Sequence, residues 1–409
     1  MKKHLSIVLS IFIISACKPH LEQSQLQVVD THIPSSWYEI PQYYAGVPKY
    51  SGAFGTYTYK HIPVAVYKND KSYQVFSDNL DGNLKIYLRV DNSQPILIHT
   101  EYGYIDPHIN ASLNIDFDDN IWIYISARNN TVKGRIYKGN TKNLHFELVG
   151  ETDAAYPQLH VSKGGLYELY SKYKFSSSKF IEREIWFRDK NRNYNVVKGG
   201  HYQISTLHNG TLYTVYNNHP RGRSDERENL YGIKLTPEGQ WHSFEDNKIN
   251  IPALPDDNRL LLYNSSKSNK LVFLKDIIFD AEGNLRVLFI ESDSQDPTIG
   301  KRKLMEWTQN GVIEVSSSGH NYNSATYIKG LDDLYLLNVT EGEPNYTGGK
   351  LQLRKLSKDH WIIEDSNEDY NFSYVRRVEN TTYKAIASVG SSSKNNGGTL
   401  VELHIIPKQ

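Results

Sequence analysis

Cysteine and methionine are almost absent from this chain of 409 residues, which has one cysteine, Cys17, and two methionines. With no second thiol, the chain can form no internal disulfide, and a cysteine nucleophile is excluded from everything after Cys17. An excess of charge of one sign is also missing, because 46 basic side chains balance 46 acidic ones. Phosphate binding needs a basic face, so we expect no nucleic-acid partner.

Only one long apolar run is present, at residues 5–16 near the N-terminus, and it is too short to span a bilayer comfortably. It follows two lysines and ends in "ISAC", which resembles the lipoprotein box of bacteria. We therefore expect a lipoprotein signal peptide over 1–16, lipidation of Cys17 and a polar tether over 17–35. An ordinary signal peptide with an incidental cysteine is the alternative. Because Lys18 rather than aspartate follows, the analogy with bacterial sorting signals predicts anchoring to the outer membrane.

Aromatic residues are plentiful, with 30 tyrosines, 13 phenylalanines and 6 tryptophans. From residue 36 onward, short alternations such as "LKIYLRV" and "IWIYISAR" have the period of two that is typical of half-buried strands. Turn signals at 118–120, 237–239, 281–283 and 309–311 favour tight hairpins. Many hairpins without helical crossovers leave a large sandwich, a β-helix or a propeller. At roughly 50 residues per blade, residues 36–409 predict one all-β domain, a seven-bladed β-propeller.

Polar side chains gather near the starts and ends of several predicted strands. Four segments carry the candidates: 104–130 with His108, Asn110 and Arg128; 156–188 with Tyr173, Arg183 and Arg188; 197–235 with His201, Tyr202, Asn218, His219 and Arg227; and 316–328 with His320, Asn321 and Tyr322. Taken singly, each has an ordinary structural explanation, such as a turn histidine or a solvated arginine. Because strand ends line the two mouths of a propeller channel, their repeated combination favours a common polar pocket.

The segments "DPHINASLNIDF", "YPQLHV", "GGHYQIS", "NNHP" and "GHNYNSATYI" follow one another as in the BNR-repeat-containing family, which this chain resembles from about Tyr38 to its end. Members of that family resemble propeller-fold polysaccharide lyases, namely ulvan lyases and rhamnose-glucuronate lyases. The resemblance implies β-elimination on glucuronate in a rhamnose- and uronate-containing glycan, which leaves a C4=C5 double bond. Such a reaction needs a carboxylate clamp, a base for the C5 proton and an acid for the departing oxygen.

The resemblance also implies the roles of individual residues. Catalytic roles fall to His108, as base or as both base and acid, to Tyr173 and to His201. Binding of the sugar and its carboxylate falls to a larger set: Asn110, Arg128, Arg183, Tyr202, His219, Arg227, His320 and Tyr322. Ulvan lyases often have a second histidine about one strand after the first, where this chain has Arg128, so a mechanism with one histidine is favoured.

Three alternatives remain open at this point. A dehydratase would use the same groups to expel water from a terminal glucuronate. A glycoside hydrolase such as a rhamnosidase would need two carboxyl groups, and Asp106, Glu182, Glu184 and Asp225 show no convincing pairing. A glycan-binding lipoprotein would need no reactive group. We expect a monomer that requires no cofactor, and no histidine or cysteine spacing predicts a dedicated metal site, although a structural calcium or zinc ion is compatible with the sequence.

Overall fold

The computed structural model describes residues 23–35, 43–44, 47–48, 60–78, 82–103, 106, 108–128, 131–176, 179–219, 227–254, 256–296, 298–340, 348–369, 371–390 and 398–408. The predicted signal peptide and Cys17 lie outside these residues, so lipidation and outer-membrane anchoring stay predictions. Within them, no helix has the length and apolar character needed to cross a bilayer.

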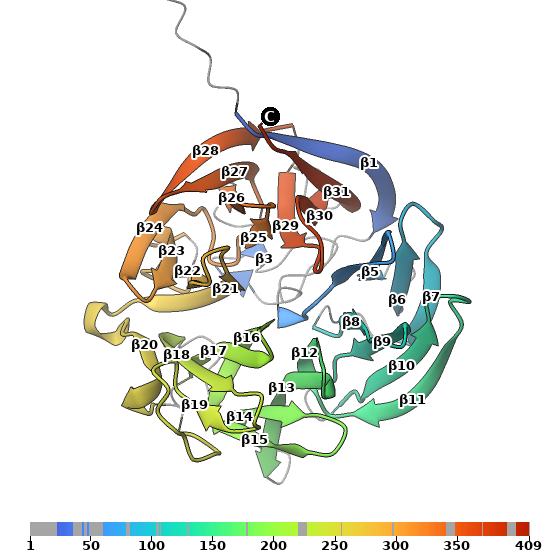
Figure 1. Cartoon of the computed structure of the whole chain (residues 1–409), viewed down its shortest axis with the longest axis horizontal. Coiled ribbons are helices and arrows are strands. Elements are labelled where there is room, and N and C mark those ends of the chain that lie inside the picture. The colour runs from blue at the N-terminus through green and yellow to red at the C-terminus, as the bar shows by residue number, and fades with distance from the viewer. Residues whose placement is uncertain are drawn as a thin grey trace, which may run out of the picture.

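The described strands form seven antiparallel blades around a central channel, which confirms the predicted seven-bladed β-propeller (Figure 1). From the channel outward, blade 1 contains β4 (Ala65–Lys68), β5 (Lys71–Asp78), β6 (Leu84–Val90) and β7 (Ile96–Glu101). Blade 2 contains β8 (Ala111–Ile115), β9 (Asn120–Ile125), β10 (Gly134–Asn140) and β11 (Phe146–Thr152). Blade 3 contains β12 (Ala155–Ser162), β13 (Gly165–Ser176), β14 (Lys179–Arg188) and β15 (Asn193–Lys198).

The remaining blades follow the same plan. Blade 4 contains β16 (Gly200–His208), β17 (Thr211–Asn218), β18 (Glu228–Leu235) and β19 (Trp241–His242), with β20 (Leu261–Tyr263) also paired to β18. Blade 5 contains β21 (Leu271–Phe279), β22 (Leu285–Ser292), β23 (Arg302–Thr308) and β24 (Gly311–Ser317). Blade 6 contains β25 (Ala325–Lys329), β26 (Leu334–Thr340), β27 (Lys350–Ser357) and β28 (His360–Asn367). Short 3₁₀ turns, η3 (Asn258–Leu260) and η4 (Ser266–Ser268), and a hairpin of β2 (Tyr43–Tyr44) and β3 (Val47–Pro48) complete the set.

Blade 7 joins the two ends of the chain. Its strands β29 (Asn371–Arg377), β30 (Lys384–Gly390) and β31 (Gly398–Ile406) are completed by β1 (Gln25–Ser35), which pairs antiparallel with β31. Residues 25–35 therefore belong to the propeller, and the tether expected over 17–35 is wrong for this part. The domain begins at Gln25 rather than at residue 36. Pairing the first strand with the last closes the ring and covers the edge of blade 7.

The turn predictions are confirmed where the structure describes them. Residues 118–120 connect β8 to β9, and 237–239 connect β18 to β19. The other two connect β21 to β22 and β23 to β24. The backbone of Asp119, Gly239, Gly283 and Gly311 has positive φ, as these tight turns require.

The innermost strands do not pair regularly along their whole length. The register of β12 with β13 shifts between Ala155 and Gln158, and that of β16 with β17 shifts between His201 and Ile204. Within these bulges Tyr156 and Tyr202 have φ of 54° and 53°, a left-handed backbone that bulky residues rarely adopt. A bulge re-aims the side chains at the start of a strand. The two tyrosines therefore mark the places where blades 3 and 4 depart from regular geometry.

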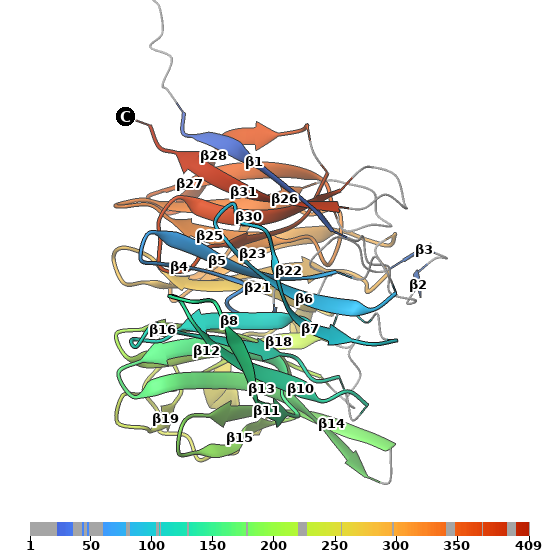
Figure 2. The same ribbon diagram turned by 90° about the vertical axis from the view of Figure 1, so that its right-hand side faces the viewer.

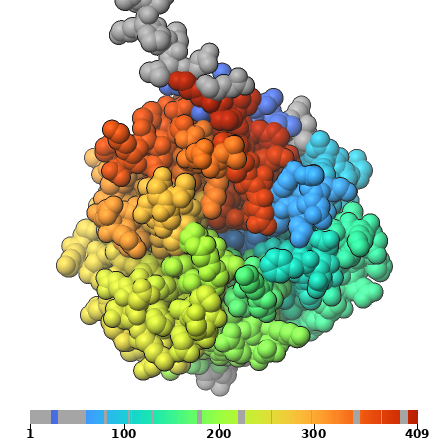
Figure 3. Space-filling model, in the orientation of Figure 1, coloured from blue at the N-terminus to red at the C-terminus, as the bar shows by residue number. Residues whose placement is uncertain are grey.

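The two mouths of the channel differ. Because β29 and β31 run in the same direction, the C-terminus marks the mouth where the inner strands end, and the β2–β3 hairpin lies on the opposite side (Figure 2). At the C-terminal mouth a cavity of about 460 Å³ is lined by residues such as Asn114, His160, Ser205 and Arg377. The face in Figure 3 is hollowed at its centre.

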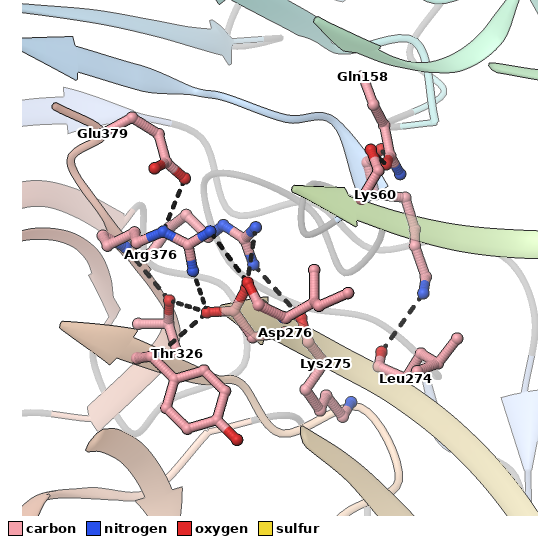
Figure 4. Close-up of polar contacts among 12 residues, drawn as sticks. Lys60, Gln158, Leu274, Lys275, Asp276, Thr326, Arg376 and Glu379 are labelled. Atoms are coloured by element: carbon pink, nitrogen blue, oxygen red, sulfur yellow. Dashed lines mark hydrogen bonds and ion pairs between the residues drawn. The ribbon is translucent and has the colours of Figure 1, made fainter. Parts of the chain in front are cut away.

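An ionic network in the channel joins blades 5, 6 and 7 (Figure 4). Asp276 on β21 is fully buried and accepts hydrogen bonds from Thr326 Oγ1 at 2.8 Å and from the Tyr327 backbone N–H at 2.9 Å, both on β25. Its carboxylate also pairs with Arg376 at 3.3 Å and with Arg377 at 2.5 Å, both on β29. Burial opposes ionisation of Asp276, but the two guanidinium groups outweigh it and lower the pKa of this carboxyl.

Candidate active site

The residues singled out in the sequence gather at the mouth where the inner strands begin. His108 precedes β8, His201 is the second residue of β16, and His320 and Tyr322 precede β25. Tyr173 lies near the end of β13, which runs back toward the same mouth. Blades 2, 3 and 4 and the segment that precedes blade 6 therefore contribute to one cluster, on the opposite side from the cavity of about 460 Å³.

His108, Asp106 and Arg128 form a chain of polar contacts at one edge of the cluster. The Asp106 carboxylate accepts hydrogen bonds from the His108 backbone N–H at 2.9 Å and from Arg128 Nε at 2.7 Å. It also contacts His108 Nδ1 closely. Burial would raise the pKa of Asp106, but His108 and Arg128 outweigh it and hold this pKa well below its ordinary value. The carboxylate therefore fixes the imidazole through Nδ1 and leaves Nε2 as the ring atom that would exchange a proton with a ligand.

Tyr173 lies beside this chain. Its hydroxyl is 3.5 Å from Arg128 Nη1 and donates a hydrogen bond of 3.4 Å to the hydroxyl of Tyr156. Arg183 lies directly opposite Tyr173 in the β13–β14 register, with its guanidinium carbon 5.4 Å from the centre of the phenol ring. Two guanidinium groups thus lie close to one phenol, that of Arg128 near its oxygen and that of Arg183 over its ring.

His201 lies on the other side of Tyr173 and is completely buried. Its ring centre is 5.9 Å from that of Tyr173, 5.5 Å from that of Tyr156 and 5.3 Å from that of His219. Nδ1 is 2.9 Å from Ser171 Oγ. Burial, followed by the charge of Arg183 and of other nearby cations, lowers the pKa of His201 well below its ordinary value. His201 is therefore neutral in this environment.

Beyond His201 the cluster becomes more aromatic and more deeply buried. Tyr202 and His219 lie with ring centres 5.1 Å apart, and Arg227 is 4.2 Å from the centre of the Tyr202 ring. Arg227 also donates a 3.0 Å hydrogen bond to the hydroxyl of Tyr322. His320 lies 5.6 Å from Tyr322, whose backbone N–H donates to His320 Nδ1 at 3.1 Å. This deeper half of the cluster, which we call its floor, consists of Tyr202, His219, Arg227, His320 and Tyr322.

Asn110 follows His108 by two residues and is completely buried. Its side-chain carbonyl accepts a hydrogen bond from the Ala111 N–H at 2.8 Å, and its backbone carbonyl accepts one from Ser126 at 2.9 Å. These bonds assign Asn110 to the framework that holds the start of β8. The residues to which the sequence assigned catalytic or binding roles lie within this cluster or, as with Asn110, support it. Arg188, another candidate, does not join it, because its Nε donates to Glu168 at 2.6 Å and its guanidinium lies over the ring of Tyr170.

Sequence reasoning missed several members of the cluster. Tyr156 is central, because its ring lies within 6.4 Å of the ring centres of four others, namely His61, His108, His201 and Tyr202. Lys60 and Lys275 are buried in the floor, where Lys60 Nζ donates to the carbonyl of Tyr202 at 2.7 Å and Lys275 Nζ to that of Asn321 at 2.9 Å. Burial, together with the charge of Arg227, lowers the pKa of both lysines well below the ordinary value. For Tyr156 the sequence did contain a signal, because "YPQ" at the start of β12 is similar to "HYQ" at the start of β16.

Exposure differs between the two halves of the cluster. Tyr173 is 9% exposed and the side chain of Arg128 is 18% exposed, and Arg183 is also partly exposed. His201 and Arg227, in contrast, are 0% exposed. A ligand would therefore meet Tyr173, Arg128 and Arg183 first.

Three of the four carboxyl groups considered for a hydrolase are engaged in ion pairs. Asp106 belongs to the chain with His108 and Arg128, whereas Glu182 and Glu184 both contact Lys174, at 2.9 Å and 3.5 Å. Asp225 lies outside the described residues. Within the part of the chain that the structure describes, no group of three histidine, cysteine or acidic side chains is placed to hold a metal ion.

The fold is similar to that of an ulvan lyase of polysaccharide lyase family PL25 solved with -[GlcA(1-4)Rha3S]- bound, with a TM-score of 0.67 at 10% sequence identity. The similarity covers 94% of this chain and 98% of that one. A second PL25 ulvan lyase structure gives a TM-score of 0.65, also at 10% identity, over 92% of this chain and 98% of the other. No protein-family model and no curated protein sequence matches the chain. Identity this low shows a shared propeller fold alone.

Proposed function

We propose that this protein is a carbon-oxygen lyase that acts by β-elimination on glucuronate in a rhamnose- and uronate-containing glycan. One observation carries the proposal: the Arg128–Asp106–His108 chain lies beside a phenol, Tyr173, that two arginines flank. Elimination needs a proton acceptor, a proton donor and a cation for the carboxylate, and these three kinds of group occur together here.

In the proposed reaction His108 Nε2 takes the C5 proton, and the electron pair left behind forms the C4=C5 double bond. The C4–O4 bond breaks, and Tyr173 gives its hydroxyl proton to the departing oxygen. Arg128 and the Tyr156 hydroxyl stabilise the resulting phenolate, because both lie within 3.5 Å of its oxygen. Proton exchange with solvent then restores His108 and Tyr173.

Arg183 is our candidate for the carboxylate clamp. Its planar guanidinium can pair with a carboxylate through two hydrogen bonds, and this pairing makes the C5 proton more acidic. Arg183 is partly exposed and lies over Tyr173, whereas Arg227 is fully buried and bonded to Tyr322. We therefore assign the clamp to Arg183 and a supporting electrostatic role in the floor to Arg227.

The printed ligand of the similar ulvan lyase, a glucuronate–rhamnose-sulfate unit, supports the choice of sugar. The depth of the cluster supports action at a chain end, because His201, His219 and Tyr202 have little or no exposure. Action at a chain end also suits the dehydratase alternative, in which water leaves C4 of a terminal glucuronate.

One assay separates these reactions. The full chain is incubated with oligosaccharides of rhamnose and glucuronate, and ultraviolet absorbance of the conjugated double bond is followed together with product masses. New absorbance with two fragments supports the lyase, and new absorbance with loss of one water supports the dehydratase. Sugar release without absorbance would indicate a hydrolase, and no change at all would leave a glycan-binding protein; either result would refute the proposal.

Two variants test the roles. His108→Ala and Tyr173→Phe are each expected to lower kcat by roughly 10²–10⁴-fold, the range that a proton-transfer group contributes. Tyr170→Phe is the matched control, since Tyr170 lies on the same strand but donates its hydroxyl to Asn193 at 2.8 Å, away from the cluster. Activity that survives in either test variant would reject the assignment of that residue.

A further inference from the structure

Two buried side chains, Ser171 on β13 and Gln203 on β16, contact His201 or each other beneath the cluster. Ser171 Oγ lies 2.9 Å from His201 Nδ1 and 2.8 Å from Gln203 Oε1. Gln203 Nε2 lies 3.4 Å from the backbone carbonyl of Tyr156. The three side chains and this carbonyl form a single line of contacts, and the direction of each hydrogen bond can be worked out.

One end of this line of hydrogen bonds is the Tyr156 carbonyl, which can only accept. A backbone carbonyl has no hydrogen to give, so the NH₂ group of Gln203 must face Tyr156 and its carbonyl oxygen must face Ser171. Ser171 then donates its single hydroxyl hydrogen to Gln203. Toward His201 the serine oxygen can act only as an acceptor, and the hydrogen between them must sit on His201 Nδ1.

A neutral imidazole with hydrogen on Nδ1 has a lone pair on Nε2. His201 Nε2 is buried and has no hydrogen-bond partner among the described residues. An unmatched buried acceptor is unfavourable unless a ligand supplies a donor. Sugar hydroxyls are such donors.

We propose that Ser171 and Gln203 are positioning residues that hold His201 as the Nδ1–H tautomer, so that Nε2 accepts a hydrogen bond from a hydroxyl of the bound sugar. The identity of the ligand as a sugar rests on the function proposed above, whereas the tautomer does not. His320 has the opposite arrangement, because its Nδ1 accepts from the Tyr322 N–H at 3.1 Å and its hydrogen therefore sits on Nε2.

Other charged or titratable groups surround His201 from every neighbouring element. They are Tyr156 on β12, Tyr173 on β13, Arg183 on β14, Tyr202 on β16, His219 after β17, Arg227 before β18 and Lys60 before β4. The cations among them oppose protonation of the ring. The neutral tautomer is therefore expected to persist across the neutral pH range.

The tautomer can be read directly by nuclear magnetic resonance on the full chain labelled with ¹⁵N-histidine. Long-range ¹H–¹⁵N spectra distinguish a protonated from an unprotonated ring nitrogen, and His201→Gln identifies the His201 signals. In the unmodified protein we expect Nδ1 to show the protonated type of shift and Nε2 the unprotonated type. A protonated Nε2 would overturn the inference without any variant.

Two variants are expected to change this pattern in different ways. Gln203→Met removes the acceptor and frees Ser171 to donate to Nδ1, so the tautomer should invert to Nε2–H. Ser171→Ala removes the partner of Nδ1, so the two tautomers should mix. Ser205→Ala is the control, because Ser205 is buried in the same layer but bonds Gln158 and His160 instead.

Spectra of His201 that do not change in Gln203→Met and Ser171→Ala would also overturn the inference. Because these measurements use the free protein, they are independent of any sugar. The expected tautomer in a protein that eliminates nothing from uronate glycans would refute the proposed function and leave the positioning role standing. Elimination activity together with a protonated Nε2 would support the proposed function and refute the positioning role of Ser171 and Gln203.

Discussion

Replacing Asp106 with asparagine tests whether the carboxylate that contacts His108 supports catalysis. Asp106 accepts from the His108 backbone N–H, contacts His108 Nδ1 and accepts from Arg128 Nε at 2.7 Å. Asparagine has nearly the same shape, but it has one acceptor oxygen and places an NH₂ group where the second oxygen was. That NH₂ group must face either the imidazole N–H or the guanidinium N–H, and two donors repel each other.

The size of the effect follows from these contacts. A hydrogen bond to a charged group contributes about 1.5–3 kcal/mol. The side chains of Asp106 and Arg128 are 22% and 18% exposed, so solvent screens the pair partly. A loss of roughly 2 kcal/mol is therefore reasonable. If it appears fully in the transition state, kcat falls roughly 30-fold at 25 °C.

The assay is the rate of formation of the unsaturated uronate by wild type and Asp106→Asn, with KM and kcat determined separately. We expect the change in kcat and little change in KM, because Asp106 orients a reacting group rather than the sugar. Asp116→Asn is the matched control, since Asp116 lies in the same blade but accepts from Asn120 and Trp122 beyond the other end of β8. A kcat for the test variant within about threefold of wild type, in a folded protein, would refute this reasoning.

Two further predictions concern stability. Asp276→Asn removes the anion between the buried Arg376 and Arg377 and should lower the free energy of unfolding by about 3–5 kcal/mol. Denaturant titration measures this change, with the surface variant Asp293→Asn as the control. Equal unfolding midpoints for the two variants would contradict the prediction. Burial outweighs Arg188 and raises the pKa of Glu168 to about 7, from an ordinary value of 4.5. Because the folded-state pKa is raised, the contribution is fully present below pH 4.5 and is lost as pH rises through about 7. Wild type should therefore lose more stability than Glu168→Gln between pH 5 and pH 8, and parallel losses in calorimetry would refute this.

Much of the propeller could be predicted from local patterns. The alternation in "LKIYLRV" predicts a strand, and β6 covers these residues, from Leu84 to Val90. Such prediction works because a half-buried strand imposes its period on its own residues. The closing strand was missed because its partner is β31, at the other end of the chain. The alternation of Leu26 and Val28 with glutamines is too short to identify a strand by itself, since the partner that makes the segment extended lies outside it.

The candidate site was likewise predictable only in part. His108, Tyr173, His201 and Arg227 were found because residues at strand ends of a propeller face a common mouth, whatever the details of each blade. Their roles as base, acid, hydrogen-bond acceptor and electrostatic support stay proposals. Tyr156 was missed because ordinary alternation does not say toward which side a residue within a bulge points, and the register shifts between Ala155 and Gln158. The carboxylate of Asp106 and the hydroxyl of Ser171 act through other side chains, a relation that no spacing in the sequence reveals.

The β-bulges on β12 and β16 link the fold to the candidate site. In a regular strand, Tyr156 and Pro157 would alternate between the two faces of blade 3, and one would be lost from the channel. The bulge adds a residue on the inner strand, so Tyr156 faces the cluster while its carbonyl still accepts from Gln203. The same irregularity on β16 lies next to His201, whose ring centre is 3.9 Å from that of Tyr202, and includes Gln203, which contacts Ser171. A left-handed backbone at two tyrosines is unfavourable, so it persists only where surrounding contacts enforce it. Here those contacts include the hydrogen bond from the Tyr156 N–H to Ser126 Oγ at 3.0 Å and the one from Lys60 Nζ to the Tyr202 carbonyl at 2.7 Å. The Tyr156 carbonyl also accepts from Gln203, which joins the bulge on β12 to the line of hydrogen bonds that ends at His201.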